Sequence, residues 1–370
     1  MVTEMPTQTR RQAIGTLLAS SFARTLTAND GLSKVDVFRA GEDGYDTFRI
    51  PALLETHKKS LLAFCEGRRF SRSDSGDIDL VMKRSQDGGR TWSALQLISD
   101  MGPNTVGNPC PVQDHRTGHI FLPLTFNPGN VTESQIIDRT VEARRRVFLA
   151  PSDDDGRSWA PPREITASVR KPEWTWYATG PGVGIQTRSG RLIIPCNHAV
   201  EGSSDFFSHV IFSDDGGRTW LLGGSAEAGT NECQVVELPD RTLLLNMRSY
   251  HGKNRRAISR SRDGGLTWSP VEWDDALVEP VCQASLIAAG KVLYFSNPAS
   301  TQRERMTVRS SFDGGRSWPG QLLLHEGPAA YSSLAPAGGK DLGCLYECGE
   351  AGPYERITFA RFSNLLLLRG

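Results

Sequence analysis

Hydrophobic residues in this chain occur in short runs, and polar or turn-forming residues separate one run from the next. The clearest runs are Val35–Phe38, Phe48–Leu54, Leu61–Phe64, Arg191–Pro195, Arg241–Asn246, Gly343–Glu347 and Arg356–Phe362. No helical periodicity is sustained between them. Short apolar runs bounded by turn residues are typical of β-strands. The pattern therefore predicts an all-β protein.

A repeated phrase, Ser-x-Asp-x-Gly-x-Thr/Ser-Trp, divides the strands into similar units. Its five copies are Ser85–Trp92, Ser152–Trp159, Ser213–Trp220, Ser261–Trp268 and Ser311–Trp318, which we call the Asp boxes. Each box is predicted to form a hairpin turn, because its Asp can accept hydrogen bonds from the following N–H groups and its Gly tolerates a positive φ. The Trp ring needs an apolar place to pack.

A repeat of roughly 50–65 residues with several short strands is typical of the blades of a β-propeller. Strands also occur before the first box and after the last one. We expect the terminal strands to share a blade, which gives a six-bladed propeller. Rings of five or seven blades remain open alternatives.

The composition agrees with this architecture and restricts the partners. The 370 residues include 37 glycines and 21 prolines, and 42 basic residues balance 42 acidic ones. A net charge of zero gives no long-range attraction to nucleic acid or to an anionic membrane. No segment has the ~20 apolar residues that a membrane-spanning helix needs. Because the seven cysteines are scattered and form no CxxC pair, neither a zinc site nor a disulfide framework is expected.

The first 33 residues differ from the rest of the chain. Paired Arg10 and Arg11 precede a weakly apolar run that ends at Ala23, which resembles a twin-arginine export signal. We therefore expect residues 1–33 to be a leader and residues 34–370 to be the catalytic propeller domain, exported to the periplasm or beyond. A basic tail on a cytoplasmic protein is the alternative interpretation.

A second set of motifs indicates which family of β-propellers this chain resembles. Phe48-Arg49-Ile50-Pro51, then Phe64–Arg68, then the Asp boxes together resemble the exo-α-sialidases (neuraminidases). The resemblance extends from about residue 35 to about residue 363. It implies a substrate with a carboxylate on its anomeric carbon. A fixed carboxylate is best held by the planar guanidinium of arginine, and the family uses three arginines. Arg49 and Arg248 match the first two, and Arg303 matches the third, with Arg305 as its competitor.

The resemblance also implies the catalytic groups. Sialidases use a tyrosine as nucleophile, and Tyr331 matches it, while Glu232 matches the glutamate that takes its proton. Asp74 lies in a polar loop suited to a general acid, with Asp77 and Asp79 nearby as competitors.

Further matches concern binding and support. Arg68 resembles the arginine that contacts the carbon-4 substituent, and Glu347 the glutamate that orients Arg49. Glu133 falls where animal sialidases have a glutamate facing the site. Asn197 and His198 stand where some relatives have tyrosines contacting the glycerol arm, although His198 alone is more typical of a structural residue.

These features together lead us to expect a retaining exo-α-sialidase that removes terminal sialic acids from glycans or glycolipids. We expect a monomer that needs no metal or organic cofactor. A non-catalytic sialic-acid-binding propeller is one alternative. A trans-sialidase, an enzyme releasing an anhydro product or a hydrolase of a related 2-keto sugar acid is another, with Trp174 and Trp176 as candidate acceptor contacts. Because the boxes contain none of the assigned residues, changing Asp87 or Asp215 should lower stability before activity.

Overall fold

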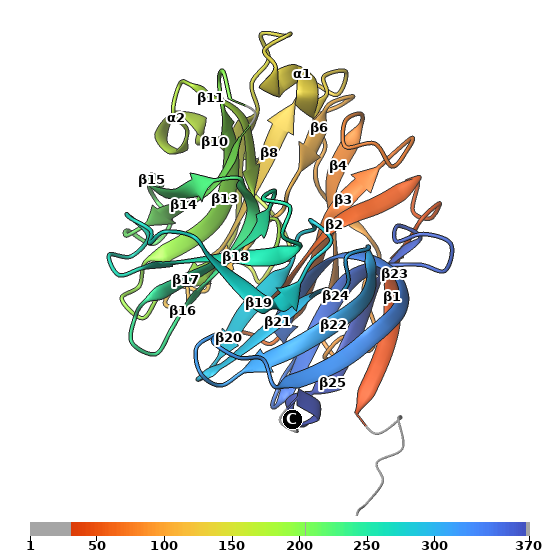
Figure 1. Ribbon diagram of the computed structural model, residues 1–370. Coiled ribbons are helices and arrows are strands. Elements are labelled where there is room, and N and C mark those ends of the chain that lie inside the picture. The colour runs from red at the N-terminus through yellow and green to blue at the C-terminus, as the bar shows by residue number, and fades with distance from the viewer. Residues whose placement is uncertain (1–30, 204, 368–370) are drawn as a thin grey trace, which may run out of the picture. The chain divides into compact units, whose positions relative to one another are not determined.

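The computed structural model describes residues 31–203 and 205–367, and the regular secondary structure of this part of the chain is almost entirely β-strand (Figure 1). The prediction of an all-β protein is confirmed. The expected export signal at residues 10–23 lies outside the described residues, so the structure does not bear on it.

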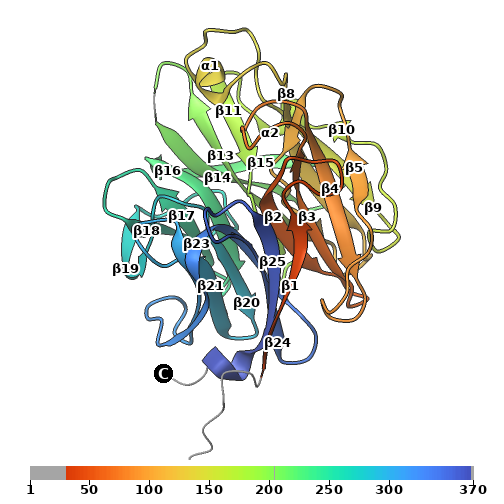
Figure 2. The ribbon, with the colours of Figure 1, turned by 90° about the vertical axis from the view of Figure 1, so that its right-hand side faces the viewer.

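The first and last described strands pair with each other. β1 (Leu32–Arg39) runs antiparallel to β25 (Arg356–Ser363), with Val35 opposite Phe359, and Figure 2 shows the two side by side. The sheet continues through β24 (Asp341–Cys348), β23 (Gly320–Pro336), β22 (Glu304–Ser311), β21 (Val292–Pro298) and β20 (Ser285–Ala289). The long strand β23 pairs with β22 through its first half and with β24 through its second half. It therefore joins two four-stranded groups.

Three more sheets hold the remaining strands. The nine-stranded sheet contains β2 (Thr47–Glu55), β3 (Leu61–Arg68), β4 (Ile78–Ser85), β5 (Gln96–Ser99), β6 (Thr105–Gly107), β7 (Val112–Gln113), β8 (Ile120–Asn127), β9 (Arg146–Ser152) and β10 (Arg163–Glu164). The five-stranded sheet contains β11 (Trp174–Thr179), β12 (Ile185–Gln186), β13 (Leu192–Val200), β14 (Phe206–Ser213) and β15 (Leu221–Ala228). The four-stranded sheet contains β16 (Thr230–Glu237), β17 (Leu243–Ser249), β18 (Arg255–Ser261) and β19 (Glu272–Val278). Within the nine-stranded sheet, β4 and β6 meet through a single parallel pair, Ile78 and Thr105.

Helical structure is limited to short pieces in the described chain. These are α1 (Glu133–Ile137), α2 (Thr166–Val169) and a 3₁₀ turn, η1 (Asn364–Leu367). α1 begins with a capping box, in which the Thr132 side chain and the Gln135 side chain bond each other's backbone N–H. Among the described residues, no helix has the length and hydrophobicity to cross a membrane.

The Asp boxes are the turns that connect paired outer strands. In the first box, Asp87 Oδ1 accepts hydrogen bonds from the N–H groups of Arg90 and Thr91, both at 3.0 Å. Ser85 Oγ accepts from the N–H of Gly89 at 2.9 Å, and Gly89 has a φ of +86°. The other four boxes repeat the contacts of the aspartate with the N–H four residues later. The predicted hairpins are confirmed.

The hydrophobic core lies in layers between neighbouring groups of strands. One layer joins Ile193 and Val210 of the five-stranded sheet to Val235 and Leu245 of the four-stranded sheet. All seven cysteines are buried and unpaired, so Cys344 and Cys348 form no disulfide. They act as small apolar side chains, as their scattered positions indicated.

Candidate active site

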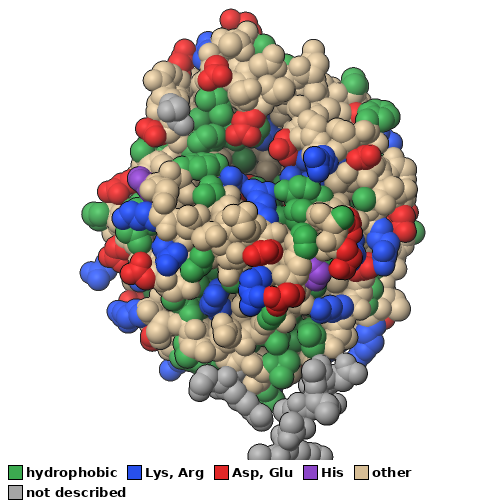
Figure 3. Space-filling model, turned by 45° about the vertical axis from the view of Figure 1, so that its right-hand side comes forward, with side chains coloured by type: hydrophobic (Ala, Val, Ile, Leu, Met, Phe, Trp, Pro, Cys, Tyr) green, Lys and Arg blue, Asp and Glu red, His purple; other side chains and the backbone are tan. Residues whose placement is uncertain are grey.

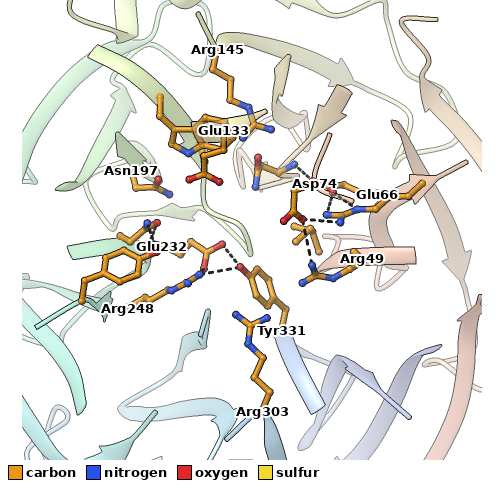
Figure 4. Close-up of a pocket in the computed structure, with 17 residues that line it drawn as sticks. Arg49, Glu66, Asp74, Glu133, Arg145, Asn197, Glu232, Arg248, Arg303 and Tyr331 are labelled. Atoms are coloured by element: carbon orange, nitrogen blue, oxygen red, sulfur yellow. Dashed lines mark hydrogen bonds and ion pairs between the residues drawn. The ribbon is translucent and has the colours of Figure 1, made fainter. Parts of the chain in front are cut away.

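A single hollow brings together residues that are far apart in the sequence. Nine of the ten residues expected at the site line it, namely Arg49, Arg68, Asp74, Glu133, Asn197, Glu232, Arg248, Arg303 and Tyr331. The tenth, Glu347, is fully buried behind Arg49. Lys and Arg side chains gather beside the hollow on the molecular surface (Figure 3). Figure 4 shows the labelled side chains converging on it from several strands.

Tyr331, in β23, and Glu232, in β16, form the closest contact at the floor of the pocket. The phenol donates a 2.6 Å hydrogen bond to Oε1 of Glu232, and Arg248 lies 2.8 Å from Oε2 of the same carboxylate. Arg248 also lies 3.3 Å from the phenol oxygen. Burial and the charge of Glu232 raise the pKa of Tyr331 above its ordinary value, although Arg248 opposes them. The free protein therefore holds a neutral phenol beside a group that can take its proton.

Three guanidinium groups surround this tyrosine. The guanidinium of Arg49 lies 5.2 Å from the centre of the Tyr331 ring, and that of Arg303 lies 5.8 Å from it, while Arg248 bonds its oxygen. Arg305 is on the exposed side, where it pairs with Glu326. The structure thus brings Arg303, and not Arg305, into the pocket. Three positive charges around one point form a strong site for an anion.

Glu347, in β24, fixes the geometry of this floor. Its carboxylate accepts hydrogen bonds from Arg49 Nε at 3.1 Å, from the backbone N–H of Ile50 at 2.8 Å and from that of Tyr331 at 3.0 Å. Ile50 has a φ of +61° at an irregularity of β2. A β-branched residue rarely adopts this left-handed conformation, and the bond from its N–H to Glu347 helps to hold it. One carboxylate therefore positions both Arg49 and Tyr331.

Asp74 approaches from the loop between β3 and β4. Its carboxylate is 70% exposed, 2.8 Å from Arg68 and 3.5 Å from Arg49. Partial loss of hydration beside the pocket tends to raise the pKa of Asp74, but the charges of Arg68 and Arg49 outweigh it and hold the pKa below its ordinary value. The competing aspartates lie elsewhere: Asp79 is buried against Tyr45 at 2.7 Å, and Asp77 pairs with Arg69 at 3.2 Å. Neither lines the pocket.

The opposite end of the pocket is polar. Burial raises the pKa of Glu133, at the start of α1, to about 7. Asn197, in β13, is 1% exposed, and neither its Oδ1 nor its Nδ2 has a hydrogen-bond partner. His198, its neighbour, points elsewhere: it bonds His209 through the two Nδ1 atoms at 3.0 Å and stacks on Trp174 with ring centres 3.4 Å apart. His198 and Trp174 thus pack in the protein, whereas Trp176 lines the pocket.

Sequence reasoning missed several side chains that complete the site. Glu66, two residues before Arg68 on β3, pairs with it at 2.7 Å. The alternation of side chains along a strand could have revealed this, because residues two apart share a face. Tyr354 accepts a 2.7 Å hydrogen bond from Arg303 and lies under the guanidinium of Arg49; no motif in the sequence indicated it.

Arg145 is the most informative of the missed residues. It stands in the run Arg144–Arg146, which is typical of a solvated surface, yet it is 3% exposed and lines the pocket. Burial lowers the pKa of Arg145 to about 10.

Comparison with known proteins places the chain in a family. A family model described as BNR repeat-like domain matches residues 59–344. The chain is 34% identical over 343 residues to a sialidase from Bacteroides fragilis (strain YCH46), covering 86% of this chain and 63% of that protein. It is 31% identical over 364 residues to an exo-alpha-sialidase from Arthroderma benhamiae, covering 88% of this chain and 86% of that one.

A solved structure agrees with these relatives. The Hadza microbial sialidase Hz136 superposes with a TM-score of 0.83 at 34% identity, over 90% of this chain and 69% of that one. The fold and the matches define a protein with BNR-like repeats. The chain belongs to the sialidase family. It spans less than two thirds of the length of the Bacteroides relative.

Proposed function

We propose that this protein is a retaining exo-α-sialidase that hydrolyses terminal sialic acids from glycans or glycolipids. The observation that carries the proposal is the 2.6 Å hydrogen bond from Tyr331 to Glu232 among three arginines. The arrangement offers an anion site and a neutral nucleophile with its base at one point. The relatives named sialidases support the same activity.

The arginines account for substrate binding. The sialic acid carboxylate enters among Arg49, Arg248 and Arg303, and its charge compensates their mutual repulsion. Because that carboxylate sits on the anomeric carbon, it places this carbon over the phenol of Tyr331. A neutral phenol approaches an anionic substrate without the repulsion that a carboxylate nucleophile would meet.

The chemistry then proceeds in two steps. Tyr331 Oη bonds to the anomeric carbon and passes its proton to Glu232, while Asp74 protonates the glycosidic oxygen as the bond to the leaving group breaks. In the second step, Asp74 takes a proton from water as the water oxygen attacks the same carbon. The phenolate leaves and recovers its proton from Glu232. Two displacements at one carbon retain the anomeric configuration.

The substrate itself provides the protonated state that Asp74 needs. In the free protein Asp74 pairs with Arg68 and lies 3.5 Å from Arg49, which keeps it ionised. When the substrate carboxylate occupies Arg49, part of this stabilisation is lost, and the pKa of Asp74 rises towards the value that a general acid requires. The 70% exposure of Asp74 leaves it free to move with its loop.

The test is product analysis by proton NMR with an aryl α-sialoside. We expect release of the α-anomer of free sialic acid first, followed by slow conversion to the β-anomer. A first-formed β-anomer would show an inverting mechanism, and an anhydro or transferred product would favour the transferase alternative. If no product formed between about pH 4 and 8, the enzymatic proposal would fail in favour of a binding propeller.

We further propose that the fold is a six-bladed propeller. β23 divides its sheet into two four-stranded groups, and the single β4–β6 pair divides the nine-stranded sheet into two more. With the five- and four-stranded sheets this gives six groups, and the pairing of β1 with β25 closes the last of them. Edge strands are protected when a ring closes in this way.

Export by the twin-arginine route is also a proposal. It rests on the sequence around Arg10 and Arg11 and would let the chain fold before it crosses the membrane. Replacing both arginines with lysine should retain the protein in the cytoplasm of its host, which cell fractionation would detect. Unchanged export of that variant would overturn this proposal alone.

A further inference from the structure

The strand that carries Tyr331 has one edge without a neighbouring strand. β22 pairs with β23 only as far as Pro328, and β24 pairs with the opposite edge of the second half. No strand of the described chain pairs with the β22 side of β23 beyond Pro328. Because buried backbone N–H and C=O groups need hydrogen-bond partners, those of this edge must find them outside the sheet.

Gln283 provides these partners for the residue that follows Tyr331. Its Oε1 accepts a 3.0 Å hydrogen bond from the backbone N–H of Ser332, and its Nε2 donates to the carbonyl of Ser332 at 2.9 Å. The same Nε2 donates to the carbonyl of Pro181 at 3.1 Å. Gln283 is 1% exposed, and Ser332 is fully buried. An amide that both accepts from and donates to one backbone residue fixes the position and orientation of that residue.

Tyr331 itself lies on a β-bulge. The register between β23 and β24 shifts by one residue between Ala329 and Ser332, and Tyr331 lies within this shift. Its backbone N–H donates to the carboxylate of Glu347 at 3.0 Å. A bulge re-aims a side chain but disrupts the ladder of hydrogen bonds around it. Glu347 on one side and Gln283 on the other replace the bonds that the ladder does not make here.

The segment that carries Gln283 is held by a buried ion pair. Arg256 and Glu279 lie 2.6 Å apart, and Arg256 also donates to the carbonyl of Cys282 at 2.7 Å. Val281, within this segment, has a φ of +52°, which a β-branched residue rarely adopts. Such a conformation persists only where the surrounding contacts determine it. Gln283 therefore extends from a rigid support.

We propose that Gln283 is a positioning residue for the nucleophile: by holding the backbone of Ser332, it fixes the place of Tyr331 Oη relative to the anomeric carbon. This inference rests on the proposed function. Gln283 does not line the pocket, so it acts through β23 and touches no substrate. Without its bonds the bulge shifts, and a displacement of about 1 Å at a reacting atom can lower a rate by about a hundredfold. The three arginines that bind the carboxylate come from other parts of the chain and keep their positions.

The test uses a sialic acid with fluorine on carbons 2 and 3. Fluoride leaves carbon 2 with the bonding electrons and needs no proton from Asp74, so adduct formation reports on the nucleophile. Tyr331 Oη bonds to carbon 2 while its proton passes to Glu232, and the fluorine on carbon 3 slows the release of the adduct. Mass spectrometry of the intact protein gives the rate, and peptide mapping gives the modified residue. Calorimetry with free sialic acid measures binding separately.

Replacing Gln283 with methionine removes both bonds to Ser332. Gln283→Met should lower the rate of adduct formation by about tenfold to a hundredfold. Because the arginines remain in place, the Kd for free sialic acid should stay within about threefold of wild type.

A glutamate at the same position makes the effect depend on pH. In Gln283→Glu a protonated carboxyl can still accept from the N–H of Ser332 and donate to its carbonyl, whereas an ionised one turns an anion towards that carbonyl. Burial favours the protonated form. The rate of adduct formation should therefore lie within about threefold of wild type at about pH 5 and fall at least about tenfold below it by about pH 8.

A second buried glutamine supplies a matched control. Gln113 is 5% exposed, accepts from the N–H of His57 at 2.8 Å and donates to the carbonyl of Gly118 at 2.8 Å. It does not line the active-site pocket. Gln113→Glu thus makes the same chemical change in a similar pair of backbone bonds. In both glutamate variants the free energy of unfolding should fall as pH rises, but the adduct rate of Gln113→Glu should match wild type at every pH.

The outcomes distinguish this inference from the proposed function. Wild-type rates in both Gln283 variants would overturn the positioning role and leave the sialidase proposal intact. Equal losses in Gln113→Glu and Gln283→Glu would also overturn it, because the rate would then follow stability. A wild-type protein that forms no adduct on Tyr331 would overturn the proposed nucleophile and this inference together. If Gln283→Met does not fold, the pH series of Gln283→Glu and its control decides.

Discussion

Tyr331 donates a 2.6 Å hydrogen bond to Glu232, although the two residues are 99 positions apart in the chain. They come from different sheets, β23 and β16, and meet where both strands reach the pocket. Neither residue would be reactive alone. A neutral phenol is a poor nucleophile without a base, and a glutamate can act as a base only when a group that gives up a proton lies beside it. The pair is the feature of this protein that most directly indicates chemistry.

Replacing the proposed nucleophile should remove activity without removing the substrate site. In Tyr331→Phe the ring remains between Arg49 and Arg303, but the attacking oxygen is lost. We expect kcat to fall at least about a thousandfold, with binding of free sialic acid, measured by calorimetry, within a few fold of wild type. Full retention of kcat would mean that Tyr331 is not the nucleophile.

The role of Asp74 predicts a dependence on the leaving group. Asp74→Ala removes the proton donor, which matters most when the departing oxygen is strongly basic, as in a sugar. We expect kcat/KM to fall by about a hundredfold to ten-thousandfold on a sialyl oligosaccharide and much less on a nitrophenyl sialoside. Asp77→Ala is the control, since Asp77 does not line the pocket. Equal losses on both substrates would argue against general acid catalysis by this residue.

Glu133 predicts a pH dependence of stability. Burial raises its pKa in the folded protein to about 7, so between its ordinary range and pH 7 the folded state binds more protons than the unfolded state. The free energy of unfolding therefore falls as pH rises through this window. Glu133→Gln should reduce the fall between about pH 5 and pH 8 by roughly 1–3 kcal/mol, which urea unfolding at the two pH values would measure. An identical fall in both proteins would contradict the raised pKa.

The Asp boxes predict a loss of stability without a loss of chemistry. Burial acts to raise the pKa of Asp154, but its hydrogen bonds with Ser158 outweigh this and bring it to about 2. Asp154→Ala should lower Tm by about 2–4 °C and leave kcat at 25 °C within about twofold of wild type. The adjacent Asp153 is exposed and is the control, since Asp153→Ala should change neither quantity.

The stability of the same turn at low pH gives a second measurement. Because the folded-state pKa of Asp154 is depressed, its contribution is present above the ordinary carboxyl range and is lost as pH falls towards 2. The stability difference between wild type and Asp154→Ala should therefore shrink on acidification. A difference that grew at low pH would contradict the hydrogen-bonded turn.

Local patterns could predict the strands and turns because their causes are local. The apolar run Phe48–Leu54 and the Asp and Gly of each box depend on residues close in sequence, and both appear as expected in β2 and in the hairpins. The site residues could be assigned because motifs such as Phe48–Pro51 resemble a known family. Arg145 could not be assigned to the site from the sequence, because a run of three arginines looks the same whether its middle residue is buried or exposed.

By itself, the sequence determined that the chain is built from repeated β-hairpins, and its resemblance to a known family indicated which residues to expect at the site. Only the tertiary structure decided which of these residues meet. It turned Arg303 inwards and Arg305 outwards, tied Arg49 and Tyr331 to Glu347, and left Arg145 and Asn197 unpartnered in the pocket. The physical reason is that burial and hydrogen bonding depend on what packs against a side chain, and in this fold that neighbour comes from a distant strand.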